Sequence, residues 1–299
     1  MIENKEKLRF SPAHFAGMCL LPAALLLGLI RIDLALLPLT GFLGLCAVAP
    51  FFPRLEFFLP MVNQGKTGRK AVAITFDDGP DPVSTPILLR LLLEHEIHAT
   101  FFVNGHKAAG YPALIRRILH EGHTLGNHSY GHDNLLMLRS KEILQKEIVL
   151  VQQELEKYGV LTHAFRPPVC VTNPTLGKVL HKLGMYAVGF SCRAPDAGNR
   201  WVETLSARIL KKVRPDDIIL LHDVLPPKKE LLPIWRREME AILHGLAADG
   251  FAVLPLATLI GREVMSKLPE QKAQTGGGAM TWDKTNIHVT RNAFTVAPK

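Results

Sequence analysis

The sequence predicts an α/β domain built on a mostly parallel sheet or barrel, preceded by a helical hairpin in the membrane. Three observations favour this architecture. Two long apolar runs open the chain, strand-length apolar runs then alternate with amphipathic stretches from residue 71, and this pattern ends near residue 265. A chain of 299 residues is long enough for one large domain or two small ones.

The two N-terminal apolar runs cover residues 10–30 and 34–52, with a short link at 31–33. Each run is close to the ~20 residues that a helix needs to cross a bilayer. So short a link makes the two helices antiparallel. A signal peptide fits poorly, because a second apolar run follows at once and no small-residue cleavage site precedes charged sequence. A buried hairpin in a soluble protein remains an alternative, since prolines interrupt both runs at Pro22, Pro38 and Pro50.

Basic residues flank the outer ends of this predicted hairpin, at Lys5, Lys7, Arg9, Arg54, Lys66, Arg69 and Lys70. Such residues prefer the cytoplasmic side of a membrane, so both ends of the hairpin and everything after residue 70 are expected there. If only the second run crosses the bilayer, the same domain is exported instead.

The net charge of +8 first suggests a nucleic-acid partner. Residues 71–265, however, carry 22 basic and 21 acidic groups, a balance of +1 with no organised basic stripe. We therefore expect no nucleic acid. Four cysteines are too few for a disulfide scaffold, and 47% apolar residues exclude disorder over most of the chain. The sequence contains no evidence on oligomeric state.

The pattern divides the chain into a hairpin with its linker (1–70), an α/β domain (71–265) and a flexible tail (266–299) that contains three consecutive glycines. Seven strands are expected in the middle segment, one fewer than a complete eight-unit barrel has. They lie near residues 72–76, 99–103, 123–126, 164–166, 185–190, 217–221 and 251–253.

Two of these strands are followed by possible metal ligands. Asp77 and Asp78 come at the end of the first, and adjacent carboxylates repel each other unless a cation offsets them. The alternative is an Asp-rich turn that caps the next helix. His128 and His132 follow the third strand and are four residues apart, so both can reach one ion. This spacing also arises by chance, but an Asp with two His is the set of a catalytic metal site.

Two further strand ends place Arg166 and His222 at the same edge of the sheet. Alone, each has a plain structural explanation: Arg166 as an ordinary ion-pair residue, and His222 as a hydrogen-bonded core residue. What distinguishes this chain is that four strand ends together supply Asp-Asp, two His, Arg and His.

The segments TFDDGP, HSYGH, FRPP and LLHD, in this order and at these separations, resemble the motifs of the NodB-homology polysaccharide deacetylases, carbohydrate esterase family 4. The resemblance covers about residues 70–262. It implies an incomplete or distorted (β/α)₇ barrel, in agreement with the seven strands counted independently.

Residue by residue, the resemblance implies that Asp77 is the general base and that Asp78, His128 and His132 hold a divalent metal. The expected metal is Zn²⁺, with Co²⁺, Ni²⁺ or Mn²⁺ as alternatives. It further implies that Arg166 orients Asp77 and that His222 is the general acid.

Two motifs depart from the family. Val169 and Cys170 replace the usual aromatic residue and Gly, so the aromatic wall of the groove is lost. The backbone N–H of Val169 is still present, and the resemblance implies that it stabilises the oxyanion. Asp196 is the counterpart of the fourth-motif Asp that sets the pKa of His222, although an ion pair with nearby Arg193 is an alternative.

Together these features predict a membrane-anchored hydrolase that removes N-acetyl groups from amino sugars of a polysaccharide or a lipid-linked glycan. One alternative is a deformylase of a lipid-linked amino sugar. The other is a catalytically silent sugar-binding or scaffold protein.

Overall fold

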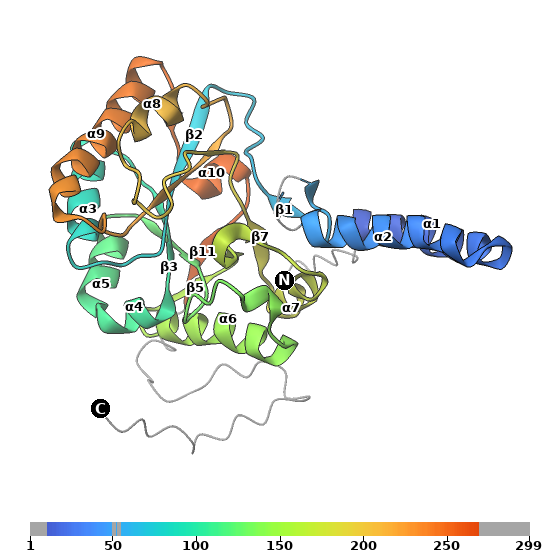
Figure 1. Ribbon diagram of the computed structural model, residues 1–299. Coiled ribbons are helices and arrows are strands. Elements are labelled where there is room, and N and C mark those ends of the chain that lie inside the picture. Colours follow the sequence, from blue (N-terminus) through green and yellow to red (C-terminus); the bar gives the residue numbers. More distant parts are fainter. Residues whose placement is uncertain (1–10, 50–51, 53–54, 269–299) are drawn as a thin grey trace.

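The computed structural model describes residues 11–49, 52 and 55–268. The described chain begins with two apolar helices, α1 (Pro12–Ile30) and α2 (Ile32–Val48), joined at the single extended residue Arg31. Figure 1 shows them side by side and projecting from the rest of the molecule. Their leucines remain exposed, for example Leu29 at 78% and Leu37 at 79%. By length and composition α1 is able to cross a membrane, whereas α2 has only 17 residues.

The base of the hairpin is attached to the α/β domain. The Ala13 N–H donates a hydrogen bond to the carbonyl of Phe57 at 2.9 Å, and Phe57 and Leu59 are buried. Residues 61–68, which the sequence analysis placed in the linker, contribute strand β1 (Met61–Val62) to the sheet. The sheet therefore includes residues that precede position 71.

The domain is built on a curled parallel sheet, in the order β1-β7-β6-β4-β3-β2-β9-β8, with β10 paired to the first half of β2. Each pairing in this sheet is parallel. The order leaves β1 and β8 as edges, so the strands form a half-barrel. Its strands are β2 (Ala71–Asp77), β3 (Thr100–Val103), β4 (Thr124–Asn127), β6 (Ala164–Phe165), β7 (Tyr186–Val188), β8 (Cys192–Arg193), β9 (Ile218–His222) and β10 (Ala252–Val253).

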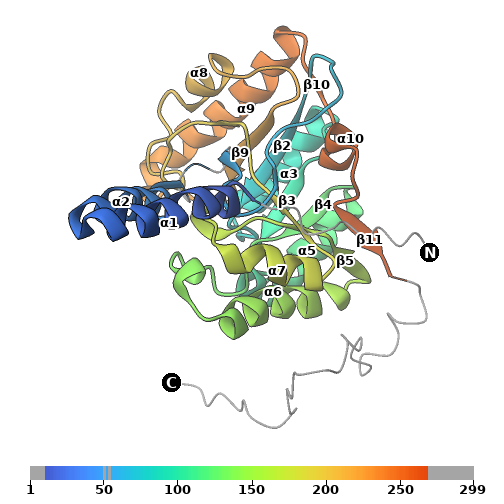
Figure 2. The ribbon, with the colours of Figure 1, turned by 90° about the vertical axis from the view of Figure 1, so that its right-hand side faces the viewer.

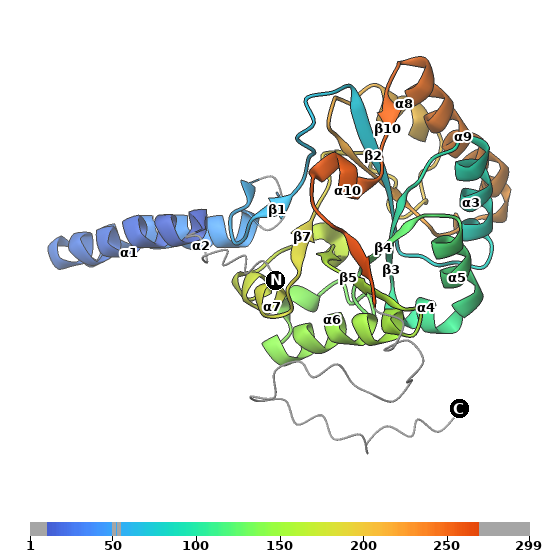
Figure 3. The ribbon, with the colours of Figure 1, turned by 180° about the vertical axis from the view of Figure 1, so that it is seen from behind.

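Helices cover the outer face of the sheet (Figures 1 and 2). They are α3 (Ser84–Glu94), α4 (Gly105–Gly110), α5 (Pro112–His120), α6 (Lys141–Glu156), α7 (Pro174–Lys182), α8 (Leu205–Leu210) and α9 (Leu232–Ala248). The short helix α10 (Leu256–Ile260) packs on the inner face instead. Short 3₁₀ turns lie at Leu136–Leu138, Pro168–Cys170 and Lys229–Leu231. A separate antiparallel pair, β5 (Val160–Thr162) with β11 (Met265–Lys267), lies beside the barrel, as Figure 3 shows from behind.

Side-chain alternation along β2 separates the core from the site. Val72, Ile74 and Phe76 point to the large outer core beneath the helices. The intervening residues point inward, where Ala71 and Ala73 pack with the side chains of α10. Because successive strand residues face opposite sides, Thr75 and Asp77 also face the interior of the half-barrel.

Each of the seven strands predicted from sequence is present, and the incomplete (β/α)₇ barrel is confirmed. The short strands β1, β5, β8 and β11 were not expected. They have two or three residues each, too few for a periodic signal. The tail that we predicted to be flexible lies outside the described residues from position 269 onward.

Candidate active site

The predicted site residues come together at the carboxyl ends of the strands. Asp77 ends β2 and stands opposite His222, the last residue of β9, in the parallel register. His128 follows β4 directly, and Arg166 follows β6. Parallel pairing brings these strand ends to one edge of the sheet, so residues up to 145 positions apart share one site.

Arg166 is a fully buried cation beneath Asp77. Its Nη1 donates to Asp77 Oδ1 at 2.7 Å and lies 2.8 Å from Thr75 Oγ1, while Nη2 donates to the Gly189 carbonyl at 2.7 Å. The guanidinium also lies 4.0 Å from the centre of the Phe102 ring. These contacts fix one oxygen of Asp77 and leave Oδ2 facing the site, 3.8 Å from His128 Nε2.

Asp78, His128 and His132 form a compact ligand set, with one ligand atom from each residue within 4.8 Å of the others. Asp78 Oδ1 lies 2.9 Å from His132 Nε2 and 3.4 Å from His128 Nε2. The backbone makes this convergence possible by positive φ angles at Asp78 (71°), Ser129 (64°) and His132 (52°). Non-glycine residues at positive φ carry strain, and such strain is typical of functional sites.

The donors in this set suit a divalent metal. His128 Nδ1–H donates to the Arg166 carbonyl at 2.7 Å, which turns its Nε2 toward Asp78 and fixes the tautomer in the manner of metal-bound histidines. Two imidazole nitrogens and one carboxylate oxygen match Zn²⁺ and related ions, with coordination positions left for water and substrate. Zn²⁺ therefore fits the residues present.

Electrostatics in this set couple the three side chains. Burial alone raises the pKa of Asp78, but hydrogen bonds from His128 and His132 outweigh it and hold that pKa far below the ordinary range. Burial likewise lowers the pKa of His128, yet the carboxylates of Asp77 and Asp78 prevail and raise it. In this arrangement a cation is favoured between the carboxylates and the imidazoles, whether a proton or a metal supplies the charge.

His222 lies across the site from the ligand set and is oriented by Asp196. Its Nδ1–H donates to Asp196 Oδ2 at 2.8 Å, and both side chains are largely buried. Burial lowers the pKa of His222, but the hydrogen bond and charge of Asp196 outweigh it and raise the pKa. Asp196 thus contacts His222, and among the described residues no ion pair joins it to Arg193, the alternative left open by the sequence.

Val169 lies in the 3₁₀ turn that follows Arg166, with φ 49° and a side chain that is 57% exposed. Cys170 next to it also has positive φ. Among the described residues, no acceptor is present for the Val169 N–H. The other thiol of interest, Cys192, packs in a different core cluster from Cys170, and neither of the two forms a disulfide.

Four supporting residues escaped the sequence analysis: Thr75, Lys107, Asn199 and Asp223. Thr75 accepts a hydrogen bond from Arg166. Its position two residues before Asp77 could have indicated this, because alternate residues of a strand face the same side of the sheet. Asn199 donates its amide to the carbonyls of His222 and Val224, at 3.1 and 2.7 Å, and so fixes the loop around the imidazole. No periodicity marks an isolated Asn in a loop.

Asp223 is a buried residue next to the Asp77-Asp78 turn, and its N–H donates a hydrogen bond to the Asp77 carbonyl at 2.8 Å. It accepts hydrogen bonds from Ser84 Oγ at 2.7 Å and Thr85 Oγ1 at 2.6 Å. A side chain at position 79 would collide with Asp223, so this site requires Gly79. Burial raises the pKa of Asp223 to about 7.

Comparison with known proteins identifies the family. The polysaccharide deacetylase model matches residues 64–188. A chitooligosaccharide deacetylase of Azorhizobium caulinodans is 35% identical over 198 residues, which cover 63% of this chain and 93% of that protein. A peptidoglycan-N-acetylglucosamine deacetylase of Bacillus cereus is 36% identical over 156 residues, covering 52% of this chain and 73% of that one.

Solved structures agree. A peptidoglycan N-acetylglucosamine deacetylase solved with a benzamide compound has a TM-score of 0.62 at 28% identity, covering 70% of this chain and 95% of that one. A family 4 carbohydrate esterase from Streptomyces lividans, solved with acetate, has a TM-score of 0.57 at 29% identity, covering 65% and 96%. The chain belongs to the polysaccharide deacetylase family and is a deacetylase. Each of these four relatives is named a deacetylase or a carbohydrate esterase.

Proposed function

We propose that this protein is a divalent-metal-dependent amidohydrolase that removes N-acetyl groups from amino sugars of a glycan at a membrane. One observation carries the proposal: Asp77, the set Asp78-His128-His132, and the Asp196-His222 pair all lie at the carboxyl end of the sheet, with Asp77 and His222 opposite each other in register. A base, a metal-ligand set and an acid together are sufficient for metal-assisted hydrolysis of an unactivated amide.

Asp77 is the general base in this proposal. Arg166 donates to Oδ1 and fixes the orientation of the carboxyl, so Oδ2 is the oxygen that takes the proton of the attacking water. A bound divalent ion would lower the pKa of that water and polarise the acyl carbonyl. Zn²⁺ is the ion we expect, because two imidazoles and a carboxylate are its preferred ligands.

His222 completes the reaction as general acid. Asp196 holds its Nδ1–H, so Nε2 is the atom that faces the site and carries the proton to the departing amine. An amine must be protonated to leave, since an amide is otherwise re-formed. The unpartnered N–H of Val169 is the backbone donor that we assign to the developing oxyanion.

The substrate class follows from the relatives, which are named for chitooligosaccharide and for peptidoglycan N-acetylglucosamine. We propose an N-acetylated amino sugar. The exposed aliphatic Val169 stands where a wall of the groove is expected, so a short or lipid-linked glycan suits this site better than an extended polymer.

The decisive experiment measures acid release from lipid-linked and polymeric N-acetyl and N-formyl amino sugars, with and without chelator. We expect acetate from at least one N-acetyl sugar, and no release after chelation. Formate in place of acetate would move the protein to the deformylases. Release that is indifferent to chelator would overturn the role of the metal.

The location at a membrane is supported by the apolar hairpin. Among the described residues, α1 has no buried residue and α2 has only Pro38, so most of the apolar surface of the hairpin remains exposed. Exposed leucines over two helices are unfavourable in water. We propose that the hairpin inserts in the bilayer with the domain in the cytoplasm. Fusions after Lys267 test this: a fluorescent protein that folds only inside the cell should be active, and a phosphatase active only outside should not.

A further inference from the structure

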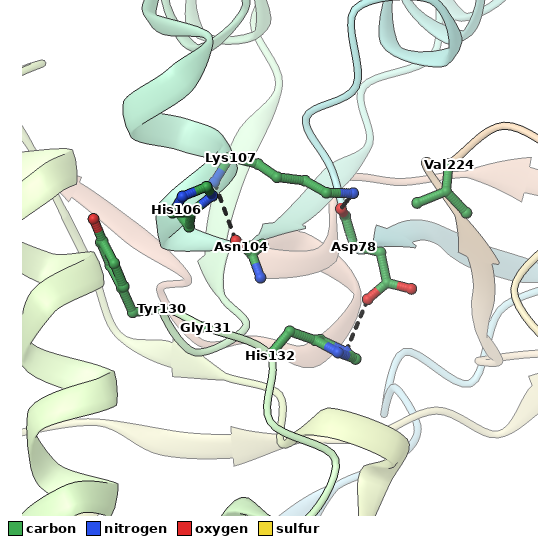
Figure 4. Close-up of a pocket in the computed structure, with 8 residues that line it drawn as sticks. All are labelled: Asp78, Asn104, His106, Lys107, Tyr130, Gly131, His132 and Val224. Carbon is green, nitrogen blue, oxygen red and sulfur yellow. Dashed lines mark hydrogen bonds and ion pairs between the residues drawn. The ribbon is translucent and has the colours of Figure 1, made fainter. Parts of the chain in front are cut away.

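A pocket of about 560 Å³ opens beside the metal-ligand set, on the side of α4 (Figure 4). Asp78 and His132 form one end of it. The remaining polar lining comes from Asn104 at the end of β3, from His106 and Lys107 in the first turn of α4, and from Tyr130 in the loop after β4. A substrate held over the ligand set therefore has room for a substituent on this side.

Lys107 gives the pocket a fixed positive charge. Its ammonium donates one hydrogen bond to the Asp78 carbonyl at 2.7 Å, and Figure 4 shows the side chain stretched along the pocket toward that atom. An ammonium has three donors, so two remain for another partner. No carboxylate of the described residues forms an ion pair with Lys107.

The amide of Asn104 adds a second donor to the lining. Asn104 Oδ1 accepts from the Lys107 N–H at 3.1 Å, which fixes the amide and turns its nitrogen to the pocket. Tyr130 and His106 also line the pocket with their rings edge to face, and Figure 4 shows the Tyr130 hydroxyl turned away from Asp78 and His132. The Lys107 ammonium and the Asn104 amide nitrogen are therefore the donors of the lining that suit an acceptor group on the ligand.

Acidic side chains around the pocket already have partners. Glu147 Oε2 accepts from the Gly131 N–H at 2.7 Å, and Asp133 pairs with Arg139 at 2.6 Å. Asp223, which lies behind the Asp78 turn, takes hydrogen bonds from two hydroxyl groups. Asp78 is the one carboxylate in the lining, and it belongs to the metal-ligand set.

We propose that this pocket binds an anionic group carried by the N-acetylated sugar, with Lys107 as the residue that selects it. The inference rests on the proposed function. A phosphoryl group on the sugar and a carboxylate of an acidic sugar share the required chemistry, because each presents several acceptor oxygens with negative charge.

Binding to the full chain in detergent, loaded with Zn²⁺, tests the proposal by calorimetry. Three ligands share one sugar: the neutral methyl glycoside of N-acetylglucosamine, N-acetylglucosamine 1-phosphate, and N-acetylmuramic acid. The variant Lys107→Gln removes the charge but keeps an amide donor near Asp78. Lys182→Gln, on the exposed face of α7, is the matched control.

We expect at least one anionic ligand to bind about tenfold more tightly than the neutral one. Lys107→Gln should lose this preference, while Lys182→Gln keeps it. The ligand that is preferred identifies a phosphoryl or a carboxylate group. Equal binding of all three ligands overturns the proposal, and so does a preference that survives in Lys107→Gln, because the metal then holds the anion.

Acetate release, measured in parallel, separates this proposal from the proposed function. Turnover of the neutral glycoside without any anion preference in binding would overturn the pocket alone. An anion preference that depends on Lys107, with no acid released from any sugar, would leave the pocket standing and overturn the hydrolase activity.

Discussion

Asp77 Oδ1 and Arg166 Nη1 lie 2.7 Å apart in the interior of the half-barrel, where Asp77 is 5% exposed and Arg166 is fully buried. A buried ion pair is stable only when its remaining polar atoms are also satisfied. Thr75 and the Gly189 carbonyl do this for Arg166. The base is thereby held in one orientation, with its second oxygen toward the ligand set.

Asp77→Asn should abolish turnover without releasing the metal. The amide keeps the shape of the carboxyl and still accepts from Arg166, but it cannot take a proton, so kcat should fall by about 10²- to 10⁴-fold. Acetate release and metal content by mass spectrometry are the two measurements. Asp81→Asn, in the same turn, is the control, because Asp81 caps α3 through Val83 and Ser84. A variant that keeps a third of wild-type kcat would remove Asp77 from the mechanism.

Asp196→Asn should move the alkaline limb of the kcat/KM profile to lower pH. The limb reports the general acid, and Asp196 raises the pKa of His222 against the effect of burial. Because the pKa is raised in the fold, the pair adds stability below about pH 6.5 and loses it as pH rises through the folded pKa. Asp133→Asn, on the other side of the site, should leave the limb in place. An unchanged limb in Asp196→Asn would assign the alkaline pKa to another group.

His132→Ala should weaken Zn²⁺ binding by more than ~100-fold, since even partners outside the ligand set contribute 10- to 100-fold. His132 is partly exposed, so the variant should remain folded, whereas His128 is buried. Competition with a chelator gives the Kd. His106→Ala provides the comparison, because His106 lines the same pocket without being a ligand. Equal Zn²⁺ affinity in His132→Ala and wild type would contradict the assigned set.

Asp223→Asn should make stability less dependent on pH. Burial raises the pKa of Asp223 to about 7, so between about pH 4 and pH 7 the folded state binds more protons than the unfolded state does. The contribution of this group to the free energy of unfolding therefore falls as pH rises from about 4 to about 7, by up to about 4 kcal/mol. Denaturant unfolding of wild type and variant at pH 5 and pH 8 gives the difference. Exposed Asp249→Asn should show no such change, and an identical pH dependence in Asp223→Asn would show that the carboxyl is ionised in the fold.

Sequence patterns were sufficient where the signal is periodic or local. Seven strands, the helices between them and the hairpin all follow from apolar spacing. We predicted that six side chains share one site, because parallel strands deliver their carboxyl ends to one edge, and the structure places them together there: Asp77, Asp78, His128, His132, Arg166 and His222. The two-residue strands β1 and β8 were missed, since pairing with a neighbour rather than a pattern of their own makes them strands.

The amino-acid sequence by itself determined the family and the half-barrel and named the candidate site residues, because these depend on residue type and on order along the chain. Tertiary structure alone decided how they are supported. Three supporting contacts join positions that are 29 to 144 residues apart in the sequence. They are Thr75 with Arg166, Asp223 with Gly79, and Lys107 with the Asp78 carbonyl. Such contacts leave no periodic trace, since each depends on the distance between two folded segments.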